Sequence, residues 1–301
     1  MKDERDAGGG LGLGSDPRGI GDATPPEQQQ EWPGDEDALR PVADHGETSY
    51  RGAGRLRDRA ALITGGDSGI GRAVAIAFAR EGADIAIAYY DEHDDAEETA
   101  RWVRDAGRRA VLLPGDLTSR DVCRDTVERA LAELGRLDVV VNNAAFQWEE
   151  HALEDITAEQ VERTFRTNIF AYIWIAQAAL EHLGPGGVIL NTGSVTALDG
   201  NAGLIDYSAT KGAIHTFTKS LAQAVADRGI RVCGVAPGPV WTPLIPATLD
   251  PEHVDRFGGD TLWKRPAQPI EIATSYVFLA SDDGRYYSGE ILTPTGRAAS
   301  R

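Results

Sequence analysis

Residues 64–71 read Thr-Gly-Gly-Asp-Ser-Gly-Ile-Gly, directly after an apolar run over 60–64 and directly before a helical pattern that begins at Arg72. Glycines at spaced positions let the backbone turn tightly and approach a ligand closely. The first turn of the helix offers unpaired N–H groups and the positive end of the helix dipole. This order of strand, turn and helix predicts a diphosphate site over Ser68, Gly69 and Ile70.

Seven short apolar runs alternate with helical patterns over the rest of the chain. The runs cover 60–64, 85–89, 110–113, 138–142, 188–192, 230–235 and 290–292, and the helices include 72–81, 122–134, 158–182, 207–227 and 269–281. Such alternation predicts βαβ units and a parallel sheet that is buried on both faces. We expect an α/β fold, a single doubly wound Rossmann domain over 57–301 with a seven-stranded parallel sheet.

Residues 1–56 differ from the rest in composition. They are rich in Gly, Pro, Gln and acids and poor in residues that could build a core. We expect them to form an N-terminal arm that is partly extended.

The charge balance excludes some classes of partner. With 30 Lys and Arg against 47 Asp and Glu, the formal charge is −17, which repels nucleic acids and anionic lipid surfaces. There is no signal-peptide pattern and no apolar run long enough to span a bilayer. The two cysteines, Cys123 and Cys233, have no metal-site or disulfide spacing. We expect a cytoplasmic protein with reduced thiols, no metal, and no nucleic-acid or membrane partner.

The carboxyl ends of the second, third and fourth strands carry further candidate ligand contacts, which are Tyr89, Asp116, Leu117, Asn143 and Ala144. An acid at the end of the second strand is typical of NAD sites, and Tyr89 stands there instead. This favours NADP(H) over NAD(H), with Arg72 as the nearest candidate base. Asp116 could hold an adenine amino group or cap the following helix, and both interpretations stay open.

Tyr207 and Lys211 lie four residues apart at the start of a predicted helix, so both project from one face. A lysine cation about 5 Å from the phenol would stabilise the phenolate by roughly 3 kcal/mol, or about 2 pKa units. Tyr207 could then exchange a proton with an alcohol or a reduced carbonyl. Ser194, just past the fifth strand, could donate to the substrate oxygen as negative charge grows on it.

Together these motifs resemble the short-chain dehydrogenase/reductase family, over residues 57–296. The Asp67 loop, 114–117, 165–170, 236–246 and the arm further resemble a subgroup of bacterial general-stress oxidoreductases and related aldehyde reductases. The resemblance implies transfer of a hydride between a nicotinamide cofactor and a small aldehyde, ketone or alcohol. It also implies a homotetramer, and an arm that packs on its own domain or on a neighbouring subunit.

The resemblance assigns roles to individual residues. Lys211 would bond the ribose hydroxyls, Asn168 would hold a water that links Lys211 to solvent, and Val240 and Thr242 would fix the nicotinamide carboxamide. The candidate catalytic set is Asn168, Ser194, Tyr207 and Lys211. The candidate cofactor set is Gly65, Asp67, Ser68, Gly69, Ile70, Gly71, Tyr89, Asp116, Leu117, Asn143, Ala144, Tyr207, Lys211, Pro237, Gly238, Val240 and Thr242.

The segment 243–265 would form a lid over the substrate. Its aromatic and aliphatic residues could cover the substrate or pack on the subunit core. Two departures from the family pattern are Ala145, where many members have Gly, and the turn 293–297, which lacks the usual Gly-Gly ending.

Two other functions remain open. The same fold hosts epimerases and dehydratases that keep the cofactor bound, but these generally need a longer segment after the sixth strand. It could also serve a non-catalytic, cofactor-binding stress or regulatory protein, whose mark would be a broken Tyr/Lys pair.

Overall fold

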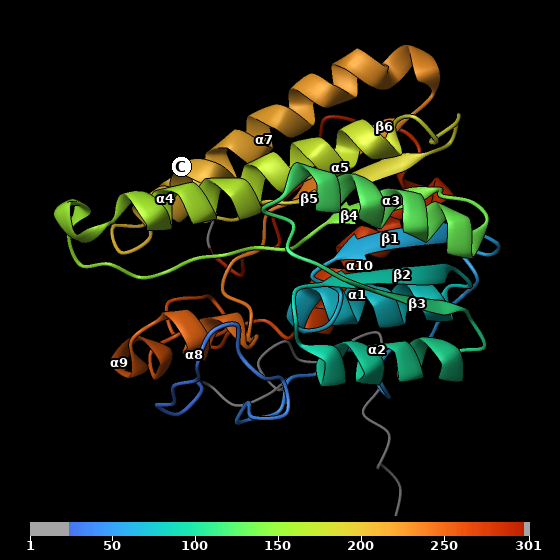
Figure 1. The fold of residues 1–301 in the computed structure, drawn as a ribbon. Helices are drawn as coiled ribbons and strands as arrows, with labels where there is room; N and C mark the ends of the chain where they lie inside the picture. The colour runs from blue at the N-terminus through green and yellow to red at the C-terminus, as the bar shows by residue number, and fades with distance from the viewer. Residues whose placement is uncertain (1–23, 298–301) are drawn as a thin grey trace, which may run out of the picture.

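A parallel sheet of seven strands forms the centre of the protein in a computed structural model that describes residues 24–297 (Figure 1). The strands are β1 (Ala60–Thr64), β2 (Asp84–Tyr89), β3 (Ala110–Pro114), β4 (Val139–Asn142), β5 (Val188–Thr192), β6 (Arg231–Val235) and β7 (Ile291–Leu292). Their order in the sheet is β3-β2-β1-β4-β5-β6-β7. The predicted doubly wound Rossmann fold is therefore confirmed. The strand order reverses between β1 and β4, and ligands bind at such a switch point.

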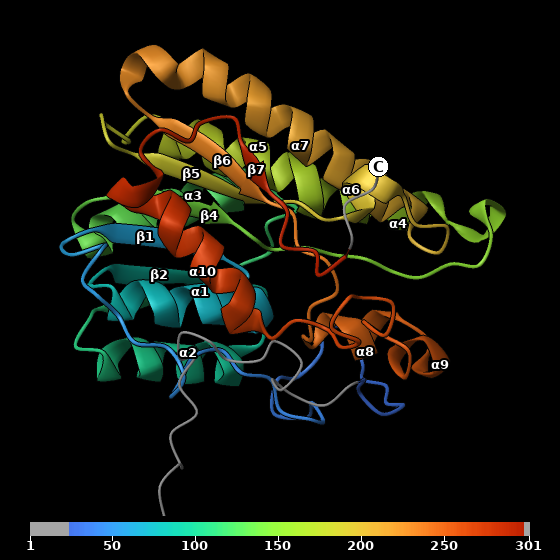
Figure 2. The same ribbon diagram turned by 180° about the vertical axis from the view of Figure 1, so that it is seen from behind.

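Apolar residues on both faces of the strands explain the layers. All residues of β1 and β5 are buried, as expected for strands covered from both sides. One face is covered by α1 (Gly69–Arg80), α2 (His93–Asp105) and α10 (Pro269–Ala280), and the other by α3 (Arg120–Leu134), α5 (Ala171–Ala179) and α7 (Ile205–Val225) (Figures 1 and 2). Each side has its own apolar cluster. Cys123 and Cys233 are both buried and free.

The helix predicted over 158–182 runs without a break from Ala158 to Ala179, but it is not α-helical throughout. It consists of α4 (Ala158–Phe165), a π-helical turn (Arg166–Phe170) and α5, which ends at Ala179. A π turn widens the helix by one residue, and such turns often occur at functional sites. Periodicity does not reveal a single inserted residue, so the sequence pattern suggests one long helix.

Short helices complete the described part of the chain. They are α6 (Thr196–Asp199), α8 (Leu244–Thr248) and α9 (Pro251–Val254), with 3₁₀ turns at Leu153–Asp155, Ala226–Arg228 and Asp282–Gly284. The helices α8 and α9 belong to the segment predicted as a lid.

The described part of the arm, residues 24–56, packs on the same chain beside α8 and α2 (Figure 1). The Gln30 N–H donates to the carbonyl of Pro246 at 2.9 Å, and the Trp241 indole donates to the carbonyl of Pro41 at 2.8 Å. Trp241 is 1% exposed and shares a small apolar cluster with Leu39 of the arm. This corresponds to the first of the two packing arrangements expected for the arm. Residues 1–23 lie outside the described residues.

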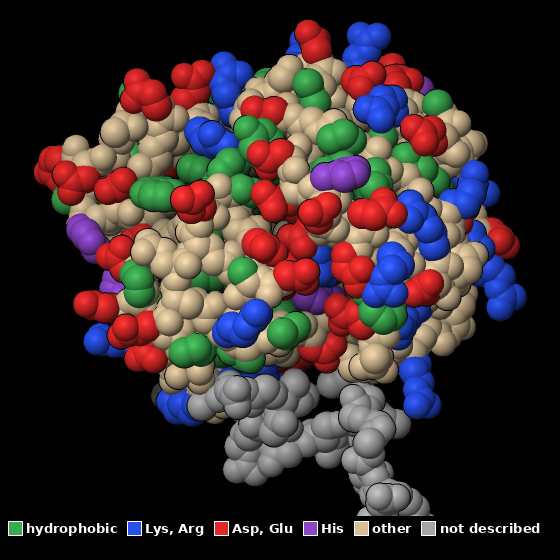
Figure 3. Space-filling view, turned by 60° about the horizontal axis from the view of Figure 1, so that its bottom comes forward, with side chains coloured by type: hydrophobic (Ala, Val, Ile, Leu, Met, Phe, Trp, Pro, Cys, Tyr) green, Lys and Arg blue, Asp and Glu red, His purple; other side chains and the backbone are tan. Residues whose placement is uncertain are grey.

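Acidic side chains are spread over the face drawn in Figure 3, interspersed with Lys and Arg. This distribution agrees with the formal charge of −17. Within residues 24–297, no helix is both long and apolar enough to cross a bilayer.

Candidate active site

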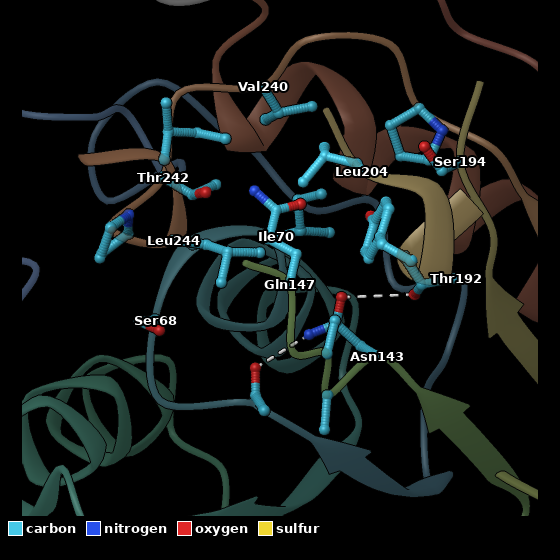
Figure 4. Close-up of a pocket in the computed structure, with 18 of the residues that line it drawn as sticks. Ser68, Ile70, Asn143, Gln147, Thr192, Ser194, Leu204, Val240, Thr242 and Leu244 are labelled. Carbon is cyan, nitrogen blue, oxygen red and sulfur yellow. Dashed lines mark hydrogen bonds between the residues drawn. The ribbon is translucent and has the colours of Figure 1, made fainter. Parts of the chain in front are cut away.

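A cavity of about 540 Å³ opens at the carboxyl edge of the sheet, between the start of α1 and the lid. All the predicted cofactor residues except Gly71 line it, and so do Ser194, Tyr207 and Lys211. Figure 4 shows Ser68 and Ile70 of the glycine turn among the residues that line this cavity, together with Val240 and Thr242. The topology thus brings together segments that are far apart in the sequence.

Close packing explains two glycines of the turn. A Cβ on Gly71 would lie 1.7 Å from the carbonyl oxygen of Gly65, so Gly71 lets α1 begin against the turn rather than contacting a ligand. Gly65 has a φ of +59°, and a Cβ there would lie 2.9 Å from the Cα of Ala144. Ser68, the N-cap of α1, makes no side-chain capping bond. The turn therefore offers the close backbone approach that fits a dinucleotide diphosphate, while the N–H of Gly69 at the helix N-terminus is already bonded to the carboxylate of Glu36 at 2.7 Å.

Asn143 connects three strand ends. Its Nδ2 donates to the carbonyls of Thr64 at 3.2 Å and Gly65 at 2.9 Å, and its Oδ1 accepts from the Thr192 hydroxyl at 3.3 Å (Figure 4). The side chain thus holds the glycine turn in place, and the residue also lines the cavity.

Tyr207, Lys211 and Ser194 meet on one wall of the cavity. Lys211 Nζ lies 5.2 Å from the centre of the Tyr207 ring and donates to the carbonyl of Thr192 at 2.9 Å. Ser194 Oγ accepts from both the N–H and the hydroxyl of Thr196, at 3.1 and 3.0 Å. Because Oγ is already a double acceptor, its own proton is directed elsewhere, and a donor is available beside Tyr207.

Burial controls the charges of this pair. Burial raises the pKa of Tyr207 to about 12, although a hydrogen bond with Ser194 acts in the opposite direction. Burial also lowers the pKa of Lys211 to about 7. Lys211 therefore lies close to Tyr207, as expected, but the pKa of Tyr207 is raised rather than lowered, because burial disfavours the charged phenolate.

The side-chain amide of Asn168 is bonded to residues other than Lys211. Its Oδ1 accepts from the N–H of Phe146 at 2.7 Å, and its Nδ2 donates to the Phe146 carbonyl at 2.8 Å and the Thr210 hydroxyl at 3.1 Å. Both amide protons are thus used, and Asn168 is absent from the cavity lining. The side chain thus fastens the segment after β4 to α7, and the expected contact between Asn168 and a relay water stays a prediction for its other atoms.

Arg72 is not the base near the second strand. It is 3% exposed, it pairs with Asp95 at 2.8 Å, and its Nε donates to the Asp67 carbonyl. Its guanidinium therefore lies beneath the glycine turn, outside the cavity lining. Burial, followed by the charge of Asp95, raises the pKa of Asp67 to about 6.

Asp116 forms a local turn. Its carboxylate accepts from the N–H of Thr118 at 2.9 Å, while the N-cap of α3 is Ser119. Asp116 is therefore not the N-cap of α3. It does line the cavity, so a contact with the cofactor stays a prediction.

The apolar residues in and beside the lid were expected either to cover the substrate or to pack on the subunit core, and the structure places some in each position. Leu244, Ile245 and Phe257 line the cavity, whereas Trp263 is 42% exposed and Trp241, just before the lid, packs against the arm.

Sequence reasoning missed several cavity residues. They are Trp32 and Pro33 of the arm, Arg163 and Thr167 near the π turn, and a polar group at the lid end that includes Gln147, Glu149, Asn201 and His253. His253 Nδ1 lies 2.8 Å from Glu149 Oε1, and Gln147 donates to Thr248 at 2.9 Å, so these contacts connect the lid to the segment after β4. The available signal was Trp32, the single tryptophan of residues 1–56.

A buried ionic group anchors the arm at the glycine turn. Glu36 is 2% exposed, and its carboxylate accepts from the N–H of Gly69 at 2.7 Å. His45 Nε2 lies 3.2 Å from Glu36, and its Nδ1 lies 2.9 Å from Glu47. Burial opposes the charge on His45, but the two carboxylates raise its pKa to about 9. Burial likewise opposes the charge on Glu36, yet His45 holds the pKa of Glu36 below its usual value.

This group predicts a pH-dependent attachment of the arm. A raised histidine pKa contributes stability below the unfolded value near 6.5, and this contribution declines as pH rises towards about 9. The rise in the pKa of His45 from 6.5 to about 9 corresponds to about 3 kcal/mol in the free energy of unfolding. We expect the difference in free energy of unfolding between wild type and His45→Gln, measured by denaturant titration, to shrink between pH 6.5 and about 9. A difference that stays constant over this range would contradict a charged His45.

Comparison with known proteins places this geometry in a family. A family model described as enoyl-(acyl carrier protein) reductase matches residues 65–296, most of the chain. The chain belongs to the short-chain dehydrogenase/reductase family. This is a family of NAD(P)-dependent oxidoreductases, so the predicted enzyme class is confirmed.

Individual relatives agree with this assignment. The enzyme is 49% identical over 272 residues to general stress protein 39 of Bacillus subtilis, covering 90% of this chain and 95% of the relative. It is 48% identical over 280 residues to the glucose and ribitol dehydrogenase of Daucus carota, covering 91% and 96%. A crystal structure of a short-chain dehydrogenase from Burkholderia cenocepacia J2315 in complex with NADP has a TM-score of 0.77 and 34% identity, covering 81% and 98%. The predicted resemblance to general-stress oxidoreductases is thus confirmed.

Proposed function

We propose that this enzyme interconverts a small carbonyl compound and its alcohol, with Tyr207 as the general acid and base. The substrate class is an aldehyde, a ketone or a sugar-like compound. The observation that carries the proposal is the convergence of Tyr207, Lys211 and Ser194 on the wall of the cavity that the glycine turn also lines. The carrot relative's name, glucose and ribitol dehydrogenase, supports the sugar-like end of this range.

When bound, the nicotinamide cofactor supplies or accepts the hydride. Ser194 donates to the substrate oxygen, and Tyr207 passes its phenolic proton to the same oxygen during reduction or removes it during oxidation. Lys211 stabilises the phenolate and bonds the ribose hydroxyls, and Asn168 positions α7. Val240 and Thr242, in the loop opened by Pro237 and Gly238, hold the carboxamide.

The lid end of the cavity suits a substrate with several hydroxyl groups. Its lining combines the polar Gln147, Glu149 and Asn201 with the apolar Leu204 and Leu244. Hydrogen-bonding groups among apolar walls are typical of small-molecule sites, where the few polar groups fix the orientation.

NADP(H) is the proposed preference over NAD(H), because Tyr89 stands where an acid would bond the ribose of NAD. The solved structure from Burkholderia cenocepacia, which is in complex with NADP, supports this choice. We further propose that residues 57–301 form the catalytic domain and residues 1–56 its arm, in a cytoplasmic homotetramer. The resemblance to the family supports the tetramer, which light scattering of the purified chain would measure.

A substrate screen tests the proposal directly. The purified full chain is incubated with NADPH or NADH and a panel of aldehydes, ketones and sugars, and the absorbance of the reduced cofactor is followed. We expect cofactor oxidation with at least one aldehyde or sugar, and faster oxidation of NADPH than of NADH. Tight cofactor binding without turnover on any substrate would favour the non-catalytic alternative.

A further inference from the structure

We infer that Arg163 of α4, held in place by Trp32 of the arm, binds the 2′-phosphate on the adenosine ribose of NADP(H). This inference rests on the proposed cofactor site. The residue comes neither from the glycine turn nor from the segment after β2, which are the places where the sequence led us to look for a base.

Arg163 lies at the adenosine end of the cavity. Its guanidinium carbon is 4.2 Å from the centre of the Trp32 ring, 5.0 Å from that of Phe146 and 5.9 Å from that of Tyr90. Tyr90 directly follows β2, whose carboxyl end faces the adenosine ribose in this fold. Arg163, Trp32 and Tyr90 all line the cavity. The guanidinium therefore lies near the position that a 2′-phosphate would occupy.

The charge of Arg163 has no partner in the described part of the chain. Its guanidinium makes no hydrogen bond or ion pair with residues 24–297, and its Nε is buried without an acceptor. The ring contacts are made by the guanidinium carbon, and the edge formed by the two terminal nitrogens makes no hydrogen bond or ion pair with residues 24–297. A phosphate can accept two parallel bonds from such an edge.

The neighbouring charges make this cation important. Asp67, Glu92 and Asp116 line the same end of the cavity, and each would repel a phosphate. Arg72, the other arginine near the glycine turn, is already paired with Asp95. A 2′-phosphate therefore needs Arg163, whereas the ribose hydroxyls of NAD do not.

The aromatic contacts suggest why the arm takes part. The Trp32 ring lies 5.3 Å from that of Tyr90 and 5.7 Å from that of Phe146, so it fills the space between the ends of β2 and β4. Arg163 packs against this ring from α4. Trp32 is thus a positioning residue, which keeps the long arginine side chain over the ribose position.

Binding measurements test the inference without relying on turnover. Calorimetry gives the Kd of the full chain for NADP⁺ and NAD⁺ in wild type, Arg163→Gln, Arg163→Lys and Trp32→Leu. We expect Arg163→Gln to weaken NADP⁺ binding on the order of 10- to 100-fold while the Kd for NAD⁺ changes less than about twofold. The affinity of Arg163→Lys for NADP⁺ should lie between those of wild type and Arg163→Gln, because lysine keeps the charge but cannot donate two parallel hydrogen bonds to the phosphate.

Controls separate positioning from general charge effects. Arg124→Gln removes the same charge from an exposed position on α3 outside the cavity lining, and it should change neither Kd. Trp32→Leu should weaken NADP⁺ binding less than Arg163→Gln does, and the double variant should be no weaker than Arg163→Gln alone.

The outcomes distinguish this inference from the proposed function. Unchanged binding of both cofactors by Arg163→Gln, or an equal loss for both, would overturn the role of Arg163 while leaving the cofactor site intact. Binding of neither cofactor by wild type would overturn the proposed site and this inference together.

Discussion

Tyr207→Phe is expected to lower kcat by about 10²- to 10⁴-fold, the usual contribution of a general acid or base. The substitution removes only the phenolic oxygen from a side chain that already lies in the cavity wall. Cofactor binding should change little, because the glycine turn and the Val240 loop are untouched. Steady-state kinetics and calorimetry on the same preparation check both parts.

The pH dependence gives a second readout for the same residue. Because burial raises the pKa of Tyr207 to about 12, the phenol is protonated and ready to act as an acid at neutral pH. We therefore expect reduction near neutral pH and a rate of alcohol oxidation that increases at alkaline pH. The residual oxidation by Tyr207→Phe should lack this increase. An equal increase in both proteins would assign the titration to another group.

Glu36→Ala is expected to have the largest effect on stability. Removing the carboxylate leaves Glu47 as the one remaining ion-pair partner of the buried His45. It also leaves the N–H of Gly69 without its acceptor. Breaking a buried ion pair by removing one partner costs roughly 3 to 5 kcal/mol. Denaturant titration measures this loss, and limited proteolysis should show earlier cleavage within the arm.

Asp37→Ala provides the matched control. Asp37 is the next residue, carries the same charge and is exposed. It should have little effect on the free energy of unfolding. Equal losses for the two variants would contradict the buried anchor and would point to a general effect of arm charge.

Local patterns made the sheet and the proximity of Tyr207 and Lys211 predictable. The apolar runs of β1 and β5 begin and end at the predicted residues, because strands buried on both faces read as continuous apolar segments. The Tyr207 and Lys211 spacing depends only on helix geometry. The glycine turn was predictable for the same reason, since its strand and helix are adjacent in sequence.

Contacts between distant segments were not predictable. Arg72 stands next to the glycine turn in sequence, yet its pairing with Asp95 removes it from the cavity. Arg163 lies far from β2 in sequence but reaches Tyr90 through the fold. The π turn at 166–170, which sets the position of Asn168, leaves no mark on hydrophobic periodicity. The pKa of Tyr207 depends on burial, which the spacing of two residues does not reveal.

Isotope transfer tests the proposed chemistry most directly. The full chain is given reduced cofactor in which both hydrogens on the reacting carbon of the nicotinamide are replaced by deuterium, together with the best carbonyl substrate from the screen. The alcohol is then analysed by mass spectrometry. We expect one deuterium on the carbinol carbon with wild type and almost no product with Tyr207→Phe. An alcohol without deuterium, or equal yields from the two proteins, would contradict direct hydride transfer assisted by Tyr207.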